Sequence, residues 1–213
     1  QRQMCIRDSG QGPDFSARAL LVAPNSMRSK FNMMIDREVE NAKKGLVARI
    51  IVKINSMEDR DIVQRLYAAS QAGVKITLIV RGFCCLRPGV PGLSENIKVI
   101  SIIGRFLEHS RIFHFAAGEE DQLDGEWYIS SADWMYRNLS NRVEVGVPVR
   151  DPVARARLAK IIDIHLEDSR QAWELAADGS YTRRSVPEGA DPESTAAMGT
   201  FETLMRMARG DEK

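Results

Sequence analysis

The sequence predicts an α/β fold in which a mixed, mostly parallel sheet is flanked by helices. Apolar runs at residues 20–23, 47–54 and 75–80 have the length of buried strands. Amphipathic stretches over 26–44 and 58–72 separate them. A strand–helix–strand–helix–strand order is typical of a parallel layer.

Both helices between these strands carry their apolar residues at helical spacing. The first is expected over residues 26–44, with Asn25 or Ser26 as its cap, and the second over 58–72, ended by Gly73. One face of each helix should therefore pack on the sheet. The residues that define these faces are Met27, Phe31, Met34, Ile35 and Val39 in the first helix and Ile62, Leu66 and Ala69 in the second.

The rest of the chain predicts further strands and then a long helix. The strands are expected at residues 98–103, 111–115, 126–130 and 142–149. Asp151 is a suitable cap and Pro152 a suitable first-turn residue for a helix that should run to about Ala177.

Three segments with different roles are expected along the chain. Residues 1–16 have no usable periodicity and are interpreted as an unstructured leader or non-native extension. Residues 17–179 should form one domain. Residues 180–197 are polar and rich in glycine and proline, so we expect 180–213 to be a flexible tail with a frayed helix near 201–209.

Composition narrows the possible functions. The 213 residues are 44% hydrophobic and 28% charged with a formal net charge of +1, so no global charge steers the protein to nucleic acid. No apolar run reaches the roughly 18 residues that span a bilayer. The cysteines, of which Cys84 and Cys85 are adjacent, favour a reducing compartment. Zinc-ligand spacing, a phosphate-binding P-loop and a serine nucleophile elbow are all missing.

His109 and Arg111 are the strongest candidates for chemistry. They lie two positions apart on a strand-like run, which predicts that both point to one face. A histidine can attack phosphorus or carry a proton, and an arginine can hold phosphate oxygens. Ser131 and Asp133 follow in a Ser-Ser-x-Asp turn that could support the pocket, and Asp133 could orient an imidazole. A lone histidine is more often structural, but this combination favours a functional site.

Arg81 ends a strand and opens a loop rich in glycine and proline. Ligands of open α/β sheets bind at that edge, although the residues alone leave a solvated arginine equally open. Arg87 and Arg105 flank the same region and could complete a local positive patch. His114 and His165 are expected to be structural, since strand alternation and helix position place them elsewhere.

Three stretches resemble the C-terminal catalytic region of bacterial polyphosphate kinases. They cover residues 81–96, 104–115 and 131–135, within a similarity that extends over 20–184. The resemblance implies one half of a phospholipase D-like fold, with the active site between two such halves. It also implies that His109 is an assisting acid/base and that Arg81 contacts nucleotide phosphate, with Arg111 sharing the phosphate charge.

The resemblance further implies that part of the machinery lies outside this chain. The histidine that becomes phosphohistidine and the ligands of Mg2+ would lie N-terminal to Leu20. We therefore expect a fragment, inactive alone, of a kinase that reversibly transfers the terminal phosphate of ATP to polyphosphate. ATP, ADP, polyphosphate and the missing N-terminal part would be its partners, without nucleic acid. The full-length protein would be a homo-oligomer in the cytoplasm, with attachment to the inner membrane periphery as an alternative.

Two other functions stay open at this point. A phospholipase D-type phosphodiesterase could join two copies of His109 in a homodimer, but Arg111 and Asp133 stand where that class has lysine and asparagine. A non-catalytic module that binds polyanions is the other alternative. Hydrolysis of a phosphodiester by the purified chain, together with its oligomeric state, would separate the first from the kinase.

Overall fold

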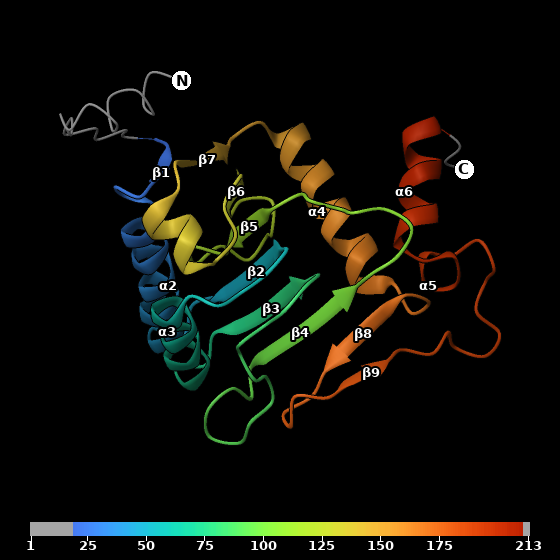
Figure 1. Ribbon diagram of the computed structural model, residues 1–213, viewed down its shortest axis with the longest axis horizontal. Coiled ribbons are helices and arrows are strands. Elements are labelled where there is room, and N and C mark those ends of the chain that lie inside the picture. The colour runs from blue at the N-terminus through green and yellow to red at the C-terminus, as the bar shows by residue number, and fades with distance from the viewer. Residues whose placement is uncertain (1–18, 211–213) are drawn as a thin grey trace.

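A mixed sheet of nine strands organises residues 19–210, the part of the chain that the computed structural model describes (Figure 1). The order of the strands across the sheet is β1-β7-β6-β5-β2-β3-β4-β8-β9. Their bounds are β1 Leu21–Ala23, β2 Arg49–Ile54, β3 Lys75–Val80, β4 Ile97–Ile102, β5 Ile112–Phe115, β6 Glu126–Ser130, β7 Glu144–Val149, β8 Ala172–Leu175 and β9 Tyr181–Arg183.

The mixed sheet is confirmed, but its predicted mostly parallel character is wrong. Across residues 19–210, only the β2–β3 and β3–β4 ladders are parallel, and the other six ladders are antiparallel. A parallel neighbour needs a long crossover, which α3 provides between β2 and β3. From β5 to β7 each strand runs antiparallel to the one before it.

Helices cover both faces of this sheet, as predicted. Figure 1 shows α2 and α3 together on one side, while α4 crosses the other. The strand β2 shows the division, because Val52 packs in the core under α2 and α3 and Ile51 packs in the core under α4. The helical bounds are α2 Met27–Lys43, α3 Arg60–Gln71, α4 Pro152–Glu167, α5 Thr195–Met198 and α6 Thr200–Arg209, and a π-helical turn η1 covers Arg137–Asn141.

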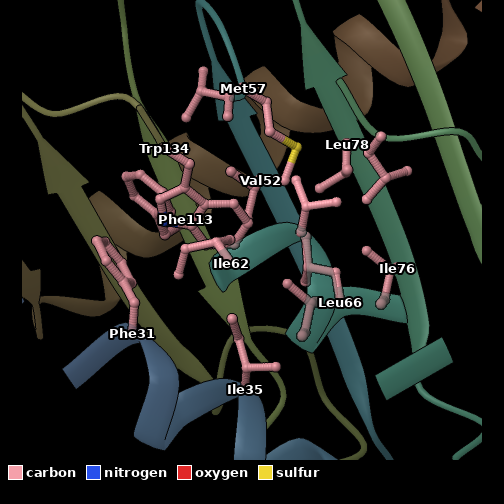
Figure 2. Packing of buried hydrophobic residues seen from close by; sticks show 14 of the residues in the cluster. Phe31, Ile35, Val52, Met57, Ile62, Leu66, Ile76, Leu78, Phe113 and Trp134 are labelled. Atoms are coloured by element: carbon pink, nitrogen blue, oxygen red, sulfur yellow. The ribbon is translucent and has the colours of Figure 1, made fainter. Parts of the chain in front are cut away.

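An aromatic cluster in the larger core lies next to the sheet edge that carries the candidate site. Phe31 of α2 meets Phe113 of β5 at 4.7 Å between ring centroids, and Trp134 lies 5.5 Å from Phe113 (Figure 2). Aromatic pairs of this kind add about 1 kcal/mol each beyond the area that they bury. Since Trp134 follows Asp133 directly, this packing fixes the Ser-Ser-x-Asp turn against the sheet.

The predicted long helix is wrong beyond Glu167, where α4 ends. The carboxylate of Asp168 accepts hydrogen bonds from the backbone amides of Arg170 and Gln171, at 2.8 and 2.7 Å. A side chain that binds the following amides in this way competes with helix formation. The chain then turns back as β8, which pairs with β4.

The predicted flexible tail is also wrong for residues 180–210. The strand β9 pairs with β8, and Phe201 of α6 is 5% exposed. The amide of Thr200 donates to Asp168 Oδ2 at 2.7 Å, which ties the start of α6 to the end of α4. The helix expected near 201–209 is confirmed as α6. The predicted leader, residues 1–16, lies outside the described residues. No helix among those described is long and apolar enough to cross a membrane.

Candidate functional site

The ends of four strands bring the predicted site residues to one edge of the sheet. The parallel strands β2 and β3 both end there, in front of Asn55 and Arg81. Because β5 runs antiparallel to β2 and β6 antiparallel to β5, the start of β5 and the end of β6 reach the same edge. His109 and the turn that contains Asp133 flank those two ends.

His109 lies in the loop before β5 and not on the strand itself. The strand begins at Ile112, so the predicted alternation of His109 and Arg111 on one strand face is wrong. The imidazole is nevertheless exposed at the site edge. A structural histidine sealed in the core is therefore excluded, and the ring is free to meet a ligand.

The guanidinium group of Arg81 reaches the loop of His109. Its Nη1 donates to the carbonyl oxygen of Glu108 at 3.2 Å. Its own carbonyl oxygen accepts from Ser101 Oγ at 3.0 Å, which fixes the backbone where β3 ends. The structure thus ties Arg81 to the loop that carries His109.

Arg111 forms a two-pronged ion pair with Asp133. The Nε–Oδ1 distance is 3.1 Å and the Nη2–Oδ2 distance is 3.0 Å. Asp133 Oδ1 also accepts from the backbone amide of Asn55 at 2.7 Å. The expectation that Asp133 orients an imidazole is therefore wrong, because its carboxylate orients an arginine. Arg111 in turn donates from Nη1 to the carbonyl oxygen of His109 at 3.0 Å.

Ser131 supports the turn and not a ligand. Its hydroxyl donates to the carboxylate of Glu144 and accepts from the backbone amide of Val145, the latter at 3.1 Å. Both contacts tie the turn to the start of β7. The Ser131 hydroxyl is thus used within the fold, and its expected role in supporting the pocket stays a prediction.

An ion pair between Lys53 and Glu108 lies next to the site, and the sequence analysis did not identify it. Lys53 of β2 is 4% exposed, and its ammonium group contacts the carboxylate of Glu108. His165 Nε2 of α4 lies 3.6 Å from the same carboxylate. Burial raises the pKa of Glu108, but His165 and Lys53 outweigh it and hold that pKa far below its ordinary value. The sequence feature that could have indicated this ion pair is Lys53, the one lysine inside the apolar run 47–54.

The remaining candidates have other contacts in the structure. Arg105 stacks over Phe106, with 5.5 Å from its guanidinium carbon to the ring centroid. Arg87 approaches Gly179 in the turn between β8 and β9, and the positive patch expected from Arg81, Arg87 and Arg105 stays a prediction. His114 is fully buried and its Nε2 lies 3.0 Å from the carbonyl oxygen of Gln122, as expected for a structural residue. Within residues 19–210, no three His, Cys, Asp or Glu side chains could together hold a metal ion.

This architecture defines an α/β protein whose mixed sheet is covered by helices on both faces. The crystal structure of Nuc from Salmonella typhimurium, described as a phospholipase D family member, has a similar fold with a TM-score of 0.50. The match covers 74% of this chain and 96% of that protein, at 13% sequence identity, so it supports the fold alone.

Closer relatives identify the family within that class. The family model described as polyphosphate kinase C-terminal domain 2 matches residues 20–195. The chain belongs to the polyphosphate kinase family. The match extends past residue 179, where the sequence predicted the domain to end.

Individual polyphosphate kinases are similar over most of this chain. The enzyme of Thermosynechococcus vestitus is 52% identical over 188 residues, which is 88% of this chain and 24% of that protein. The enzyme of Pseudomonas aeruginosa is 48% identical over 188 residues, covering 88% and 27%. The crystal structure of polyphosphate kinase from Porphyromonas gingivalis superposes with a TM-score of 0.83 at 35% identity, covering 98% and 31%. The chain thus spans about a quarter of the length of its curated relatives.

Proposed function

We propose that this chain is the C-terminal part of a polyphosphate kinase that reversibly transfers the terminal phosphate of ATP to polyphosphate. Family membership supports this proposal, as does the span of about a quarter of the curated relatives. The single observation that carries the site assignment is that His109 is exposed in a loop whose backbone carbonyl oxygens accept hydrogen bonds from the guanidinium groups of Arg81 and Arg111. The phosphohistidine of the reaction would form on another part of the polypeptide.

His109 would manage the proton in this reaction. In the first step the bond between the terminal phosphorus and the ADP oxygen breaks and a bond to a histidine nitrogen forms. In the second step the terminal oxygen of polyphosphate displaces that nitrogen. Two displacements through a histidine replace one difficult transfer. An exposed imidazole at this edge can donate a proton to a leaving group or accept one from an entering oxygen.

Arg81 would bind the phosphate oxygens. A guanidinium group has five N–H donors in a planar fork, and one hydrogen bond to the carbonyl oxygen of Glu108 leaves the others for phosphate. Arg111 is committed to Asp133 and to the carbonyl oxygen of His109, so it has fewer donors to offer. We therefore assign Arg81 the main phosphate contact and Arg111 a secondary one.

Cofactor, assembly and location complete the proposal. Mg2+ normally accompanies ATP in phosphoryl transfer. The described residues offer no group of side chains that fits this ion, so no step above uses it. Assembly of the full-length protein into a homo-oligomer and its location in the cytoplasm or at the inner membrane stay predictions.

A hybrid enzyme tests the proposed function. Residues 20–213 of this chain replace the matched C-terminal part of the Thermosynechococcus vestitus enzyme, and ATP-dependent polyphosphate synthesis is measured. The hybrid should be active, and His109→Ala should lower kcat by about 10²-fold or more, as expected for lost general acid–base catalysis. Arg157→Ala, at an exposed position of α4, is the matched control and should change little.

Two outcomes would contradict the proposal. One is a hybrid without synthesis, and the other is a His109→Ala hybrid that synthesises polyphosphate at the parent rate. Hydrolysis of bis(p-nitrophenyl) phosphate by a dimer of the 213-residue chain would instead favour the phosphodiesterase.

A further inference from the structure

We propose that Lys53 and Glu108 are positioning residues that hold the backbone of His109 in its reactive place. The inference rests on the proposed function of His109 and adds two residues to it. It starts from an uncommon arrangement of basic side chains around three successive peptide groups.

The carbonyl oxygens on both sides of His109, and its own, each accept a hydrogen bond from a different cation. Arg81 Nη1 lies 3.2 Å from the oxygen of Glu108, and Arg111 Nη1 lies 3.0 Å from the oxygen of His109. Lys53 Nζ lies 3.1 Å from the oxygen of Ser110. Lys53 lies in β2, Arg81 directly follows β3 and Arg111 directly precedes β5, so the ends of three strands together fix one short loop.

The carboxylate of Glu108 closes the turn from the other side. Its Oε1 accepts from the backbone amide of Ser110 at 3.1 Å, and its Oε2 accepts from the hydroxyl of Ser110 at 2.8 Å. The same carboxylate contacts the ammonium group of Lys53 and faces His165 Nε2. Glu108 and Ser110 are thus joined to each other and to β2, while His109 between them stays exposed.

A purely structural reason for Lys53 is weak. Its neighbours in the ladders are Ile79 of β3 and Ile112 of β5, both nearly fully buried. An apolar residue would suit this position, because a buried ion pair is often no more stable than a well-packed apolar pair. Charged groups with costly burial cluster at functional sites. Here the ammonium group of Lys53 binds the residues on either side of His109, which is the proposed acid/base.

The test measures the placement of His109 in the 213-residue chain. Tripolyphosphate is added to protein labelled with 15N-histidine, and the ring signals of His109 are followed by NMR. In the parent the signals should shift with saturation. In Lys53→Met the change in the His109 signals should fall by at least half. In Lys53→Arg most of that change should be kept, because arginine can also donate to the carbonyl oxygen of Ser110 and to the carboxylate of Glu108. Amide hydrogen exchange of Ser110 should become at least tenfold faster in Lys53→Met.

A matched ion pair elsewhere supplies the control. Arg37 binds Glu126 through two hydrogen bonds of 2.8 and 3.1 Å, and Glu126 begins β6 at the end opposite to the site. Arg37→Met should leave the response of His109 to tripolyphosphate unchanged. In the hybrid enzyme, Lys53→Met and Glu108→Gln should lower kcat by about tenfold or more, with KM for ATP within about threefold, since small misplacements at a reacting group act on the rate.

The outcomes separate this inference from the proposed function. If the parent responds to tripolyphosphate and Lys53→Met responds equally, the positioning role is wrong while the proposed function stands. If the ring signals of the parent do not respond, the proposed function itself fails. The positioning role would also be wrong if the lost His109 response in Lys53→Met matched the fraction of unfolded protein and Lys53→Arg did not recover the response.

Discussion

Arg111 and Asp133 face each other at the base of the loop that carries His109, joined by two parallel hydrogen bonds. Their side chains are 18% and 8% exposed, so the ion pair is largely shielded from water. Asp133 also binds the backbone amide of Asn55, which connects the end of β2 to the turn after β6. The pair therefore holds three strand ends together.

Loss of this carboxylate should destabilise the fold. Removal of one partner leaves the guanidinium group of Arg111 without its charge partner, and breaking a buried pair costs about 3 kcal/mol. Asp133→Ala should lower the free energy of unfolding by about that amount in urea denaturation of the 213-residue chain. The exposed pair of Arg65 and Asp36 offers a control, and Asp36→Ala should cost less than about 1 kcal/mol. Equal losses in the two variants would contradict this account.

The C-terminal helix α6 should contribute to stability through Phe201. Its ring covers Gly104, where an added Cβ would come within 2.3 Å of Phe201 Cε2, and it meets Phe106 at 6.0 Å between centroids. Phe201→Ala should lower the free energy of unfolding by about 3 kcal/mol and speed amide exchange in the loop from Gly104 to Ser110. Phe83 is 53% exposed, so the control variant Phe83→Ala should lower the free energy of unfolding by less than about 1 kcal/mol. If Phe201→Ala unfolded at the same urea concentration as the parent, α6 would contribute nothing to stability through Phe201.

Acid should destabilise the fold through His114. Burial lowers the pKa of this imidazole to about 4, and the nearby charge of Arg49 acts in the same direction. Because the unfolded chain binds this proton near pH 6.5, stability is lost as the pH falls from 6.5 towards 4. The loss between pH 7 and pH 5 should be about 2 kcal/mol.

The variant His114→Gln checks this pH dependence. Glutamine can still donate to the carbonyl oxygen of Gln122 but does not titrate. Urea denaturation at pH 7, 6 and 5 should show a flatter pH dependence for His114→Gln than for the parent. The same slope in both proteins would show that His114 takes up its proton in the folded state at ordinary pH.

The sequence was a good guide to elements and to the site edge, because both depend on local patterns. The bounds of β3 and β6 agree residue for residue with the apolar runs. Arg81 could be placed at the site edge because it directly follows a parallel strand and ligands of open α/β sheets bind there. Asp168 was missed because its side chain ends α4 within an otherwise helical pattern.

Contacts between distant parts of the chain were not predictable from these patterns. Lys53 and Glu108 lie on different elements, and nothing local marks them as partners. Phe201 lies in the frayed helix that was expected after the polar stretch 180–197, and nothing local showed that it packs against Gly104. In both cases the partner is set by the tertiary fold, which a propensity or a periodicity does not describe.

Binding of a phosphate chain at the exposed imidazole is the most direct measurement of the central claim. Tripolyphosphate titrated into the 213-residue chain at low salt should shift the ring signals of His109, and Arg81→Ala should weaken binding by about tenfold as one charge-assisted hydrogen-bond partner is lost. Arg157→Ala should bind like the parent. Tripolyphosphate binding that leaves His109 unperturbed, or that is insensitive to Arg81→Ala, would contradict the account.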